Sequence, residues 1–207
     1  MSDYQSSNFI GFHSCDEIVG KNLLTGRDEL RPSDNTWDWL GPGSYFWESD
    51  PARALKYAVE NASGTQKNKE AIKTPFVIGA IIELGNCLNL VEAESLEILN
   101  EAYSGLKELY DASGLPMPTN KEYNRALDCA IFRYIHESNK KSKRPPYDTI
   151  RCAFPEGKEA FPGSKITSRL HIQICVCNPD CIKGYFLPKP LEKYNPYLFP
   201  NAPLMGF

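Results

Sequence analysis

Apolar residues gather in short segments along the chain, and their spacing predicts several strands. Residues 76–84 (FVIGAIIEL) form an almost continuous apolar run, which is typical of a strand buried on both faces. Residues 9–13 and 44–47 predict two shorter strands. Strand-like composition returns in three later segments, residues 148–154, 171–177 and 181–187.

Helical spacing of apolar residues predicts four helices. Asp50 suits an N-cap and Pro51 suits the first helical position, so a helix is expected to begin there and to run to about residue 61. Residues 31–42 and 64–74 predict polar loops, and the tail from residue 188 is expected to be irregular. The strands and helices do not alternate strictly, which favours an α+β fold. The other three helices are expected at residues 16–24, 92–110 and 121–137.

Composition agrees with one folded domain over residues 1–207. The chain is 42% hydrophobic and 24% charged, so it can form a packed core and is not a disordered chain. The formal net charge of −3 excludes a globally basic nucleic-acid binder but not a local basic patch. No apolar run approaches the ~20 residues that span a bilayer, so no membrane association is expected.

The cysteines and the first residues suggest a cytoplasmic protein. The chain has seven cysteines, an odd number, and a domain of this size does not need disulfides, so reduced thiols are expected. The opening residues, MSDYQSSNF, lack the basic and then apolar layout of a signal peptide. Cys175, Cys177 and Cys181 lack a fourth ligand at a suitable spacing, so we expect buried thiols and no metal. His136 is expected at the surface or edge of a helix.

Three segments have residues that could carry chemistry. His13 lies at the end of a predicted strand, and a structural histidine is the simpler interpretation of it alone. Tyr45 follows a glycine-rich turn, Tyr57 lies on the next helix, and two such rings can sandwich a flat ring. Strand alternation puts Gln173 on one face of its strand with two further polar residues, Arg169 and His171.

Taken in order, five segments resemble the ADP-ribosyltransferase superfamily, in the branch that contains diphtheria toxin and the poly(ADP-ribose) polymerases. Its signature is a His, a Tyr and a Glu on three strands. The resemblance covers roughly residues 8–90 and 165–187. It implies two small antiparallel sheets that form an NAD cleft, with a helical insertion at about residues 92–145. The segments are GFHS at 11–14, GPGSYF at 41–46, ARALKY at 52–57, GAIIELGN at 79–86 and QICVCNP at 173–179.

The resemblance also implies roles for individual residues. His13 would bind the adenosine ribose, and backbone groups of Ser14 would hold the nicotinamide carboxamide. Tyr45 and Tyr57 would pack the nicotinamide ring. Phe46 and Ala54 belong to the NAD-binding motifs, and Ala54 lacks the hydroxyl that the family often has there. The catalytic set implied is His13, Tyr45 and Gln173, with NAD as co-substrate.

Two residues depart from the family pattern. Ser14 stands where the family has Gly, and Gln173 stands where it has the catalytic Glu. An uncharged amide can bind a ribose hydroxyl but cannot act as a base near neutral pH. Three hypotheses remain open: the acceptor is already a good nucleophile, a second carboxylate such as Glu48 or Asp50 substitutes, or the chain binds NAD without turning it over.

The acceptor of ADP-ribose is not identified by any motif. Nucleic acid is slightly favoured, because Gln173 is uncharged and a basic segment follows one helix; a solvated loop is the simpler interpretation of that segment. A protein acceptor and a non-catalytic NAD or ADP-ribose binding module are the alternatives. The resemblance further implies a toxin or defence effector restrained by an inhibitory partner protein. The residues expected to bind the acceptor are Arg169, His171, Lys140, Lys141, Lys143 and Arg144.

Overall fold

The computed structural model describes residues 8–63, 72–121 and 124–199. Residues 64–71, for which a polar loop was predicted, lie outside the described residues. The chain forms two compact units that are interleaved in the sequence. Unit 1 comprises Met1–Leu30, Phe46–Glu83 and Ile182–Phe207, and unit 2 comprises Arg31–Tyr45 and Leu84–Cys181.

Unit 1 is built on antiparallel strands. β1 (Asn8–Asp16) pairs along its whole length with β3 (Pro75–Glu83), and β3 also pairs with β9 (Ile182–Phe186). β2 (Ser44–Glu48), whose last three residues belong to this unit, pairs with the other edge of β1. All but two residues of β3 are buried, which confirms the prediction of a strand covered on both faces.

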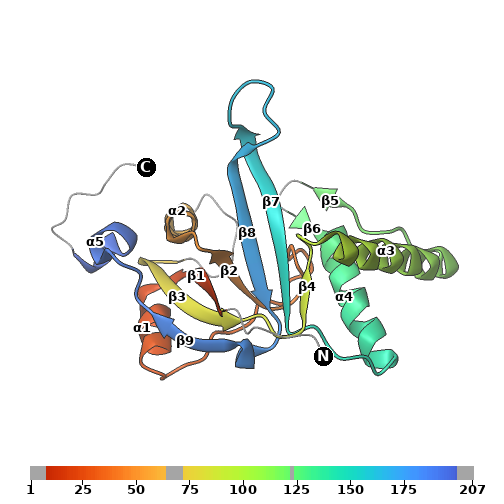
Figure 1. Ribbon diagram of the computed structural model, residues 1–207, viewed down its shortest axis with the longest axis horizontal. Coiled ribbons are helices and arrows are strands. Elements are labelled where there is room, and N and C mark those ends of the chain that lie inside the picture. The colour runs from red at the N-terminus through yellow and green to blue at the C-terminus, as the bar shows by residue number, and fades with distance from the viewer. Residues whose placement is uncertain (1–7, 64–71, 122–123, 200–207) are drawn as a thin grey trace. The chain divides into compact units, whose positions relative to one another are not determined.

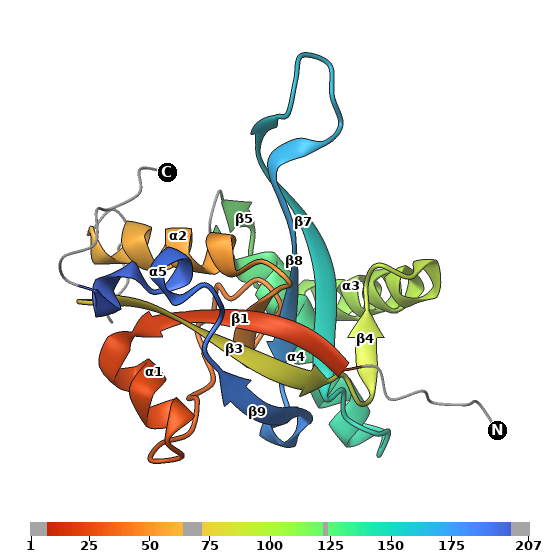
Figure 2. The same cartoon turned by 60° about the vertical axis from the view of Figure 1, so that its left-hand side comes forward.

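Two helices cover the opposite faces of these strands (Figure 2). α1 (Glu17–Leu24) is capped by Asp16 and packs on the side of Phe76 and Ile78. α2 (Pro51–Ala62) is capped by Asp50 and packs on the side of Val77. Because side chains alternate along a strand, successive residues of β3 serve the two helices. The start of α2 was predicted from its capping residue Asp50, whereas α1 was predicted from the helical spacing of its apolar residues.

The C-terminal tail of unit 1 contains two short helical turns, α5 (Leu191–Tyr194) and η2 (Pro196–Leu198). Asn195 between them is fully buried, and its side-chain amide pairs with both backbone groups of Val77, at 2.7 and 3.0 Å. This pair of hydrogen bonds attaches the tail to β3.

Unit 2 contains the strands in the order β4-β7-β8, with bounds Cys87–Asn89, Thr149–Glu159 and Thr167–Val176. β4 pairs with β7 in parallel, so the prediction of purely antiparallel sheets is wrong for this pair. A parallel pair needs a long crossover connection, and residues 92–145, predicted as a helical insertion, lie within the segment that supplies it. The observed class is α+β with mixed strand pairing.

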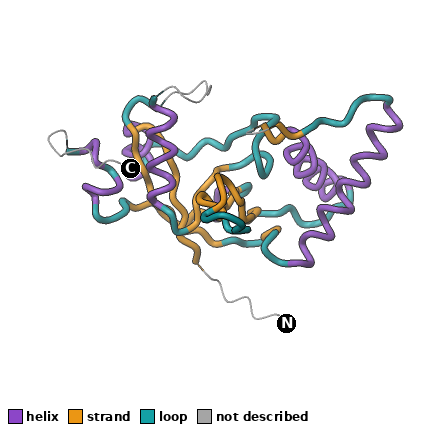
Figure 3. The backbone as a smooth tube through the Cα atoms, turned by 90° about the horizontal axis from the view of Figure 1, so that it is seen from above, coloured by secondary structure: helices purple, strands orange, loops and turns teal. Residues whose placement is uncertain are grey.

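The crossover consists of α3 (Ala93–Ser113) and α4 (Ala126–Lys141), which pack together (Figure 3), with a two-stranded ribbon between them along the chain. The ribbon pairs β5 (Asn120–Lys121) with β6 (Asn124–Arg125). α4 was predicted to begin at residue 121 and begins later, because the Asn120 side-chain oxygen accepts from the N–H groups of Leu127 and Asp128 and caps the helix there. No helix in the described part of the chain is long and apolar enough to cross a bilayer.

β7 and β8 form a long hairpin, which extends to the loop at residues 160–166 in Figures 1 and 2. Its strands are longer than predicted, since β7 was expected to end at residue 154 and β8 to begin at residue 171. The additional residues are mostly exposed and lack an apolar pattern, so backbone pairing rather than burial keeps them extended. Sequence periodicity alone therefore missed the outer half of the hairpin.

Candidate functional site

The residues expected to bind NAD are divided between the two units. Unit 2 carries Tyr45 and Gln173. Unit 1 carries the other candidates, His13, Ser14, Phe46, Ala54 and Tyr57. The convergence of these residues on one NAD molecule stays a prediction. The geometry within each unit is described below.

In unit 1, His13 lies on β1 beside β2. Its half-buried ring is 5.6 Å from the ring of Phe46, with 53° between their planes. Gly11 precedes it on the same face, where a Cβ atom would lie 2.7 Å from Cβ of Phe46 and 2.8 Å from Cδ1 of Ile82. Only glycine allows β1 to approach Phe46 this closely, so the GFHS motif has a packing reason at its first residue.

Tyr57 and Trp47 form an aromatic pair on the other face of these strands. Their ring centroids are 5.1 Å apart, and the Arg53 guanidinium carbon is 5.8 Å from the Trp47 centroid. The indole N–H of Trp47 is buried and has no hydrogen-bond partner among the described residues. Because a buried unpaired donor is unfavourable, this N–H is a candidate ligand contact that sequence reasoning missed, although Trp47 directly follows the second motif.

Three NAD-binding candidates of unit 1 have little or no exposed surface. The Ser14 hydroxyl donates to the Ala54 carbonyl at 2.5 Å, which links β1 to α2. Ala54 and Phe46 have no exposed surface at all. The Ser14 hydroxyl is therefore occupied within the fold, and direct contact of Ala54 or Phe46 with a ligand stays a prediction.

In unit 2, the hydroxyl of Tyr45 is occupied by backbone groups. It accepts from the N–H of Leu40 at 2.9 Å and donates to the carbonyl of Gly41 at 2.5 Å. Burial holds the pKa of Tyr45 far above its usual value, so the phenol stays neutral at every physiological pH. In this arrangement Tyr45 can contribute its ring to a site but not a proton.

Gln173 is held by a buried histidine on the same strand. The Gln173 Nε2 atom is 2.9 Å from the His171 Nε2 atom, and the His171 Nδ1 atom is 2.8 Å from the Arg169 carbonyl oxygen. A carbonyl only accepts, so Nδ1 carries the proton and Nε2 accepts from the Gln173 amide. The Gln173 Oε1 atom accepts no hydrogen bond from the described residues. It is therefore an oriented acceptor.

The opposite strand adds a carboxylate to this face. Cys152, Phe154 and Glu156 of β7 pair with Gln173, His171 and Arg169 of β8, respectively. The Glu156 Oε2 atom is 3.7 Å from the His171 Nδ1 atom, and the Phe154 ring packs 5.8 Å from the His171 ring. The polar chain thus runs Glu156, His171, Gln173.

Glu156 was not among the carboxylates expected to substitute for the missing Glu. Those candidates, Glu48 and Asp50, belong to unit 1, and the Asp50 carboxylate accepts from the N–H of Arg53 as the cap of α2. Asp50 therefore has a structural role in α2, and catalysis by Glu48 or Asp50 stays a prediction. Glu156 could have been found only through the register of the β7–β8 hairpin.

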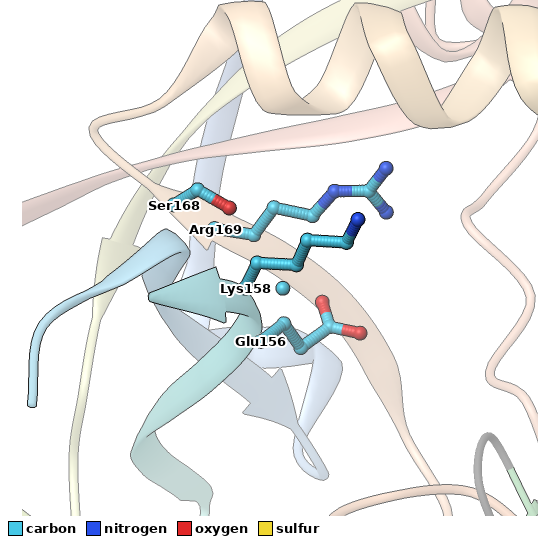
Figure 4. A pocket seen from close by; sticks show the side chains of 5 residues that line it. Glu156, Lys158, Ser168 and Arg169 are labelled. Atoms are coloured by element: carbon cyan, nitrogen blue, oxygen red, sulfur yellow. The ribbon is translucent and has the colours of Figure 1, made fainter. Parts of the chain in front are cut away.

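An open pocket of 370 Å³ lies on the hairpin and includes Glu156, the first residue of the polar chain. It is lined by Glu156, Gly157, Lys158, Ser168 and Arg169. The side chains of Lys158 and Arg169 extend in the same direction, and Glu156 lies beside them (Figure 4). The two cations and the Ser168 hydroxyl suit an anionic group, whereas the Glu156 carboxylate in the same lining repels one. Arg169 was expected to contact the substrate, which stays a prediction, and Lys158 was missed.

The basic segment at the end of α4 has a structural explanation. Lys140, Lys141, Lys143 and Arg144 are all exposed. Lys140 and Lys141 lie in the last helical turn, where cations interact favourably with the helix dipole. The acceptor-binding role of the segment stays a prediction.

The thiols of unit 2 form the last candidate cluster. All seven cysteines are free, Cys175 and Cys181 are buried, and Cys177 is half-buried. His136, expected at a surface or edge, is half-buried on α4, with its Nε2 atom 3.8 Å from the Cys177 sulfur. Within the described ranges, no group of three or more His, Cys, Asp or Glu side chains could hold a metal ion.

Comparison with known proteins identifies one distant relative. No family model matches the chain, and no solved structure matches it. The chain is 23% identical over 204 residues to the uncharacterized protein MJ0359 of Methanocaldococcus jannaschii, with 88% of this chain and 90% of that protein covered. The similarity extends over nearly the full length of both chains, so it includes both units.

Proposed function

We propose that the protein transfers ADP-ribose from NAD to a macromolecular acceptor and releases nicotinamide. The observation that carries the proposal is the fixed amide of Gln173, at the position where the resembling family has its catalytic Glu. His171 takes the hydrogen bond of the Gln173 NH₂ group, which leaves Oε1 to accept. An acceptor oxygen at this position suits a ribose hydroxyl.

The reaction breaks the bond between the ribose C1′ atom and the nicotinamide nitrogen. The bonding electrons go to the nitrogen, which neutralises the pyridinium, and C1′ forms a bond to the acceptor, which loses a proton. The ribose has oxocarbenium character in between, so a nearby negative charge lowers the barrier. Gln173 supplies orientation without charge, and Glu156 supplies a carboxylate on the same face of the hairpin.

In this proposal, His13 and Tyr57 recognise NAD from unit 1. His13 would bind the adenosine ribose, and Tyr57, next to Trp47, would pack the nicotinamide ring. The Tyr45 ring would complete the ring-packing contacts, since its hydroxyl is occupied by backbone groups.

Nucleic acid is the preferred acceptor class, with protein as the alternative. An uncharged Gln173 cannot remove a proton, which favours an acceptor atom that is already nucleophilic, such as a base nitrogen or a phosphate oxygen. Lys158 and Arg169, which extend side by side in the hairpin pocket, suit the phosphates of such an acceptor. An inhibitory partner and a toxin or defence role remain implications of the family resemblance.

A non-catalytic NAD-binding module is the second candidate function. It is favoured by the missing charge at Gln173 and by the neutral, occupied hydroxyl of Tyr45. The two candidates differ in one product, nicotinamide.

Nicotinamide release therefore tests the proposal. The protein is incubated with NAD alone and with RNA, single-stranded DNA, duplex DNA or cell protein, and nicotinamide is measured by liquid chromatography with mass spectrometry. We expect release that depends on a nucleic acid and falls strongly in Gln173→Ala. Binding of NAD without release under any of these conditions would overturn the transferase in favour of the binding module.

A further inference from the structure

A thiol and an imidazole lie side by side in unit 2, just after the end of strand β8. Cys177 follows the last residue of β8, and His136 lies on α4. The Cys177 sulfur is 3.8 Å from the His136 Nε2 atom, and the Tyr147 ring meets the His136 ring edge-on at 6.5 Å. This places a proton-carrying ring directly beside the thiol.

The surroundings of Cys177 favour the thiolate. The interaction with the neighbouring Cys175 thiol and the hydrogen bond with His136 together outweigh burial and lower the pKa of Cys177. Asp148 acts in the opposite direction, and Cys87 on β4 interacts with Cys177 electrostatically. Burial raises the pKa of Cys175, so in this pair Cys175 keeps its proton.

Among the described residues, no imidazole lies beside the other two half-buried thiols, and their pKa values shift in the opposite direction. Burial raises the pKa of Cys152 to about 11 and also raises the pKa of Cys87. Cys87, Cys152 and Cys177 are the three cysteines with intermediate exposure, and the rest are buried. Similar exposure with opposite pKa shifts makes Cys87 and Cys152 matched internal controls for Cys177.

We propose that Cys177 is a modification site for hydrogen peroxide, with His136 as the proton donor. The Cys177 thiolate attacks one peroxide oxygen, an S–O bond forms and the O–O bond breaks. The sulfur is oxidised to a sulfenic acid, and the leaving oxygen is reduced and takes the His136 proton to become water. The thiolate is the reactive species, so the cysteine with an imidazole beside it is expected to be oxidised first. Peroxide is a small oxidant, which suits a half-buried sulfur.

The inference does not rest on the proposed transferase, because every residue in it belongs to unit 2 and the chemistry needs no NAD. The folded protein is exposed to substoichiometric hydrogen peroxide at pH 7, and sulfenic acid is trapped with dimedone. Peptide mass spectrometry then quantifies all seven cysteines. We expect Cys177 to be trapped at least about tenfold more than Cys87 or Cys152. Equal trapping at the three cysteines would overturn the proposal.

Two variants separate reactivity from exposure. His136→Asn keeps a hydrogen-bonding side chain but removes the imidazole that acts as the proton donor, so trapping at Cys177 should fall several-fold, whereas Cys152→Ser should leave it unchanged. The iodoacetamide rate at Cys177 is also measured against pH in the unmodified protein. A rate that rises only near pH 8.5, as for an ordinary thiol, contradicts the proposal even if His136→Asn fails to fold.

Discussion

Gln173→Ala removes the side-chain amide whose NH₂ group donates to His171. It also removes the amide oxygen that we propose to accept from a ribose hydroxyl. The His171 Nε2 atom, on a 6%-exposed residue, loses its 2.9 Å hydrogen bond. A neutral hydrogen bond contributes about 0.5–1.5 kcal/mol, and leaving a buried acceptor unsatisfied costs about 1–3 kcal/mol. The free energy of unfolding should therefore fall by about 1–3 kcal/mol.

The same variant separates NAD binding from transfer. One lost neutral hydrogen bond to the ribose changes NAD affinity by about tenfold at most, or ~1.4 kcal/mol, whereas transfer should fall strongly because the ribose is no longer oriented. Urea denaturation followed by circular dichroism gives the stability, NAD titration calorimetry gives the affinity, and nicotinamide release gives the rate. Leu170→Ala is the control, since Leu170 is exposed and lies on the opposite face of β8.

A Gln173→Ala protein with the stability and nicotinamide release of the unmodified protein would refute this reasoning. Gln173→Glu provides the complementary test. The new carboxylate can only accept, so the His171 ring must place a proton on Nε2, and either Nδ1 gives up its bond to Arg169 or the ring becomes charged near Glu156. Turnover should rise with the added charge, and ¹⁵N chemical shifts of His171 should move. Release by Gln173→Glu alone would instead favour the binding module.

Three further predictions concern single contacts. Tyr57→Ala should weaken NAD binding by about 1–3 kcal/mol through lost stacking, whereas Tyr57→Phe should retain most of the affinity; equal losses in calorimetry would point to the hydroxyl instead. Asp16→Ala should lower the free energy of unfolding by about 1–3 kcal/mol, because the Asp16 carboxylate caps α1 and accepts from the N–H groups of Lys73 and Thr74. Burial raises the pKa of Asp16, but these hydrogen bonds outweigh it and the pKa is lowered. The stabilising effect of Asp16 should therefore be present above its unfolded-state pKa of about 3.9 and should disappear as pH falls through its folded-state pKa. Equal losses of unfolding free energy in urea titrations at pH 7 and pH 2.5 would contradict this. Gly43→Ala should destabilise the protein by about 1–3 kcal/mol, because its Cβ atom would lie 2.5 Å from the Cys175 sulfur and 2.8 Å from the Val176 carbonyl oxygen; an unchanged thermal midpoint would show that the loop can shift.

The predictable part of the fold is the part that local sequence determines. Asp16 and Asp50 cap the two helices of unit 1, and each capping hydrogen bond spans only two or three residues. The apolar run of β3 predicted a buried strand because nearly every residue of it is covered. The late start of α4 was missed, since it depends on the Asn120 side chain several residues earlier. The parallel pairing of β4 with β7 was missed because a crossover connection leaves no local signal.

In the candidate site too, contacts within one strand were predictable from the sequence, whereas contacts between strands were not. Alternation along β8 put His171 and Gln173 on one face, and the structure has them in contact. Glu156 joins them only because β7 pairs Glu156 with Arg169, and the register shifts immediately beyond, between Glu156 and Glu159. A slip of one residue would turn Glu156 to the other face of the hairpin. Position 173 has no Glu, but this face of the hairpin still has a carboxylate, because the pairing of β7 with β8 brings Glu156 to it. Any test of catalysis at Gln173 must treat Glu156 and His171 as part of the same group.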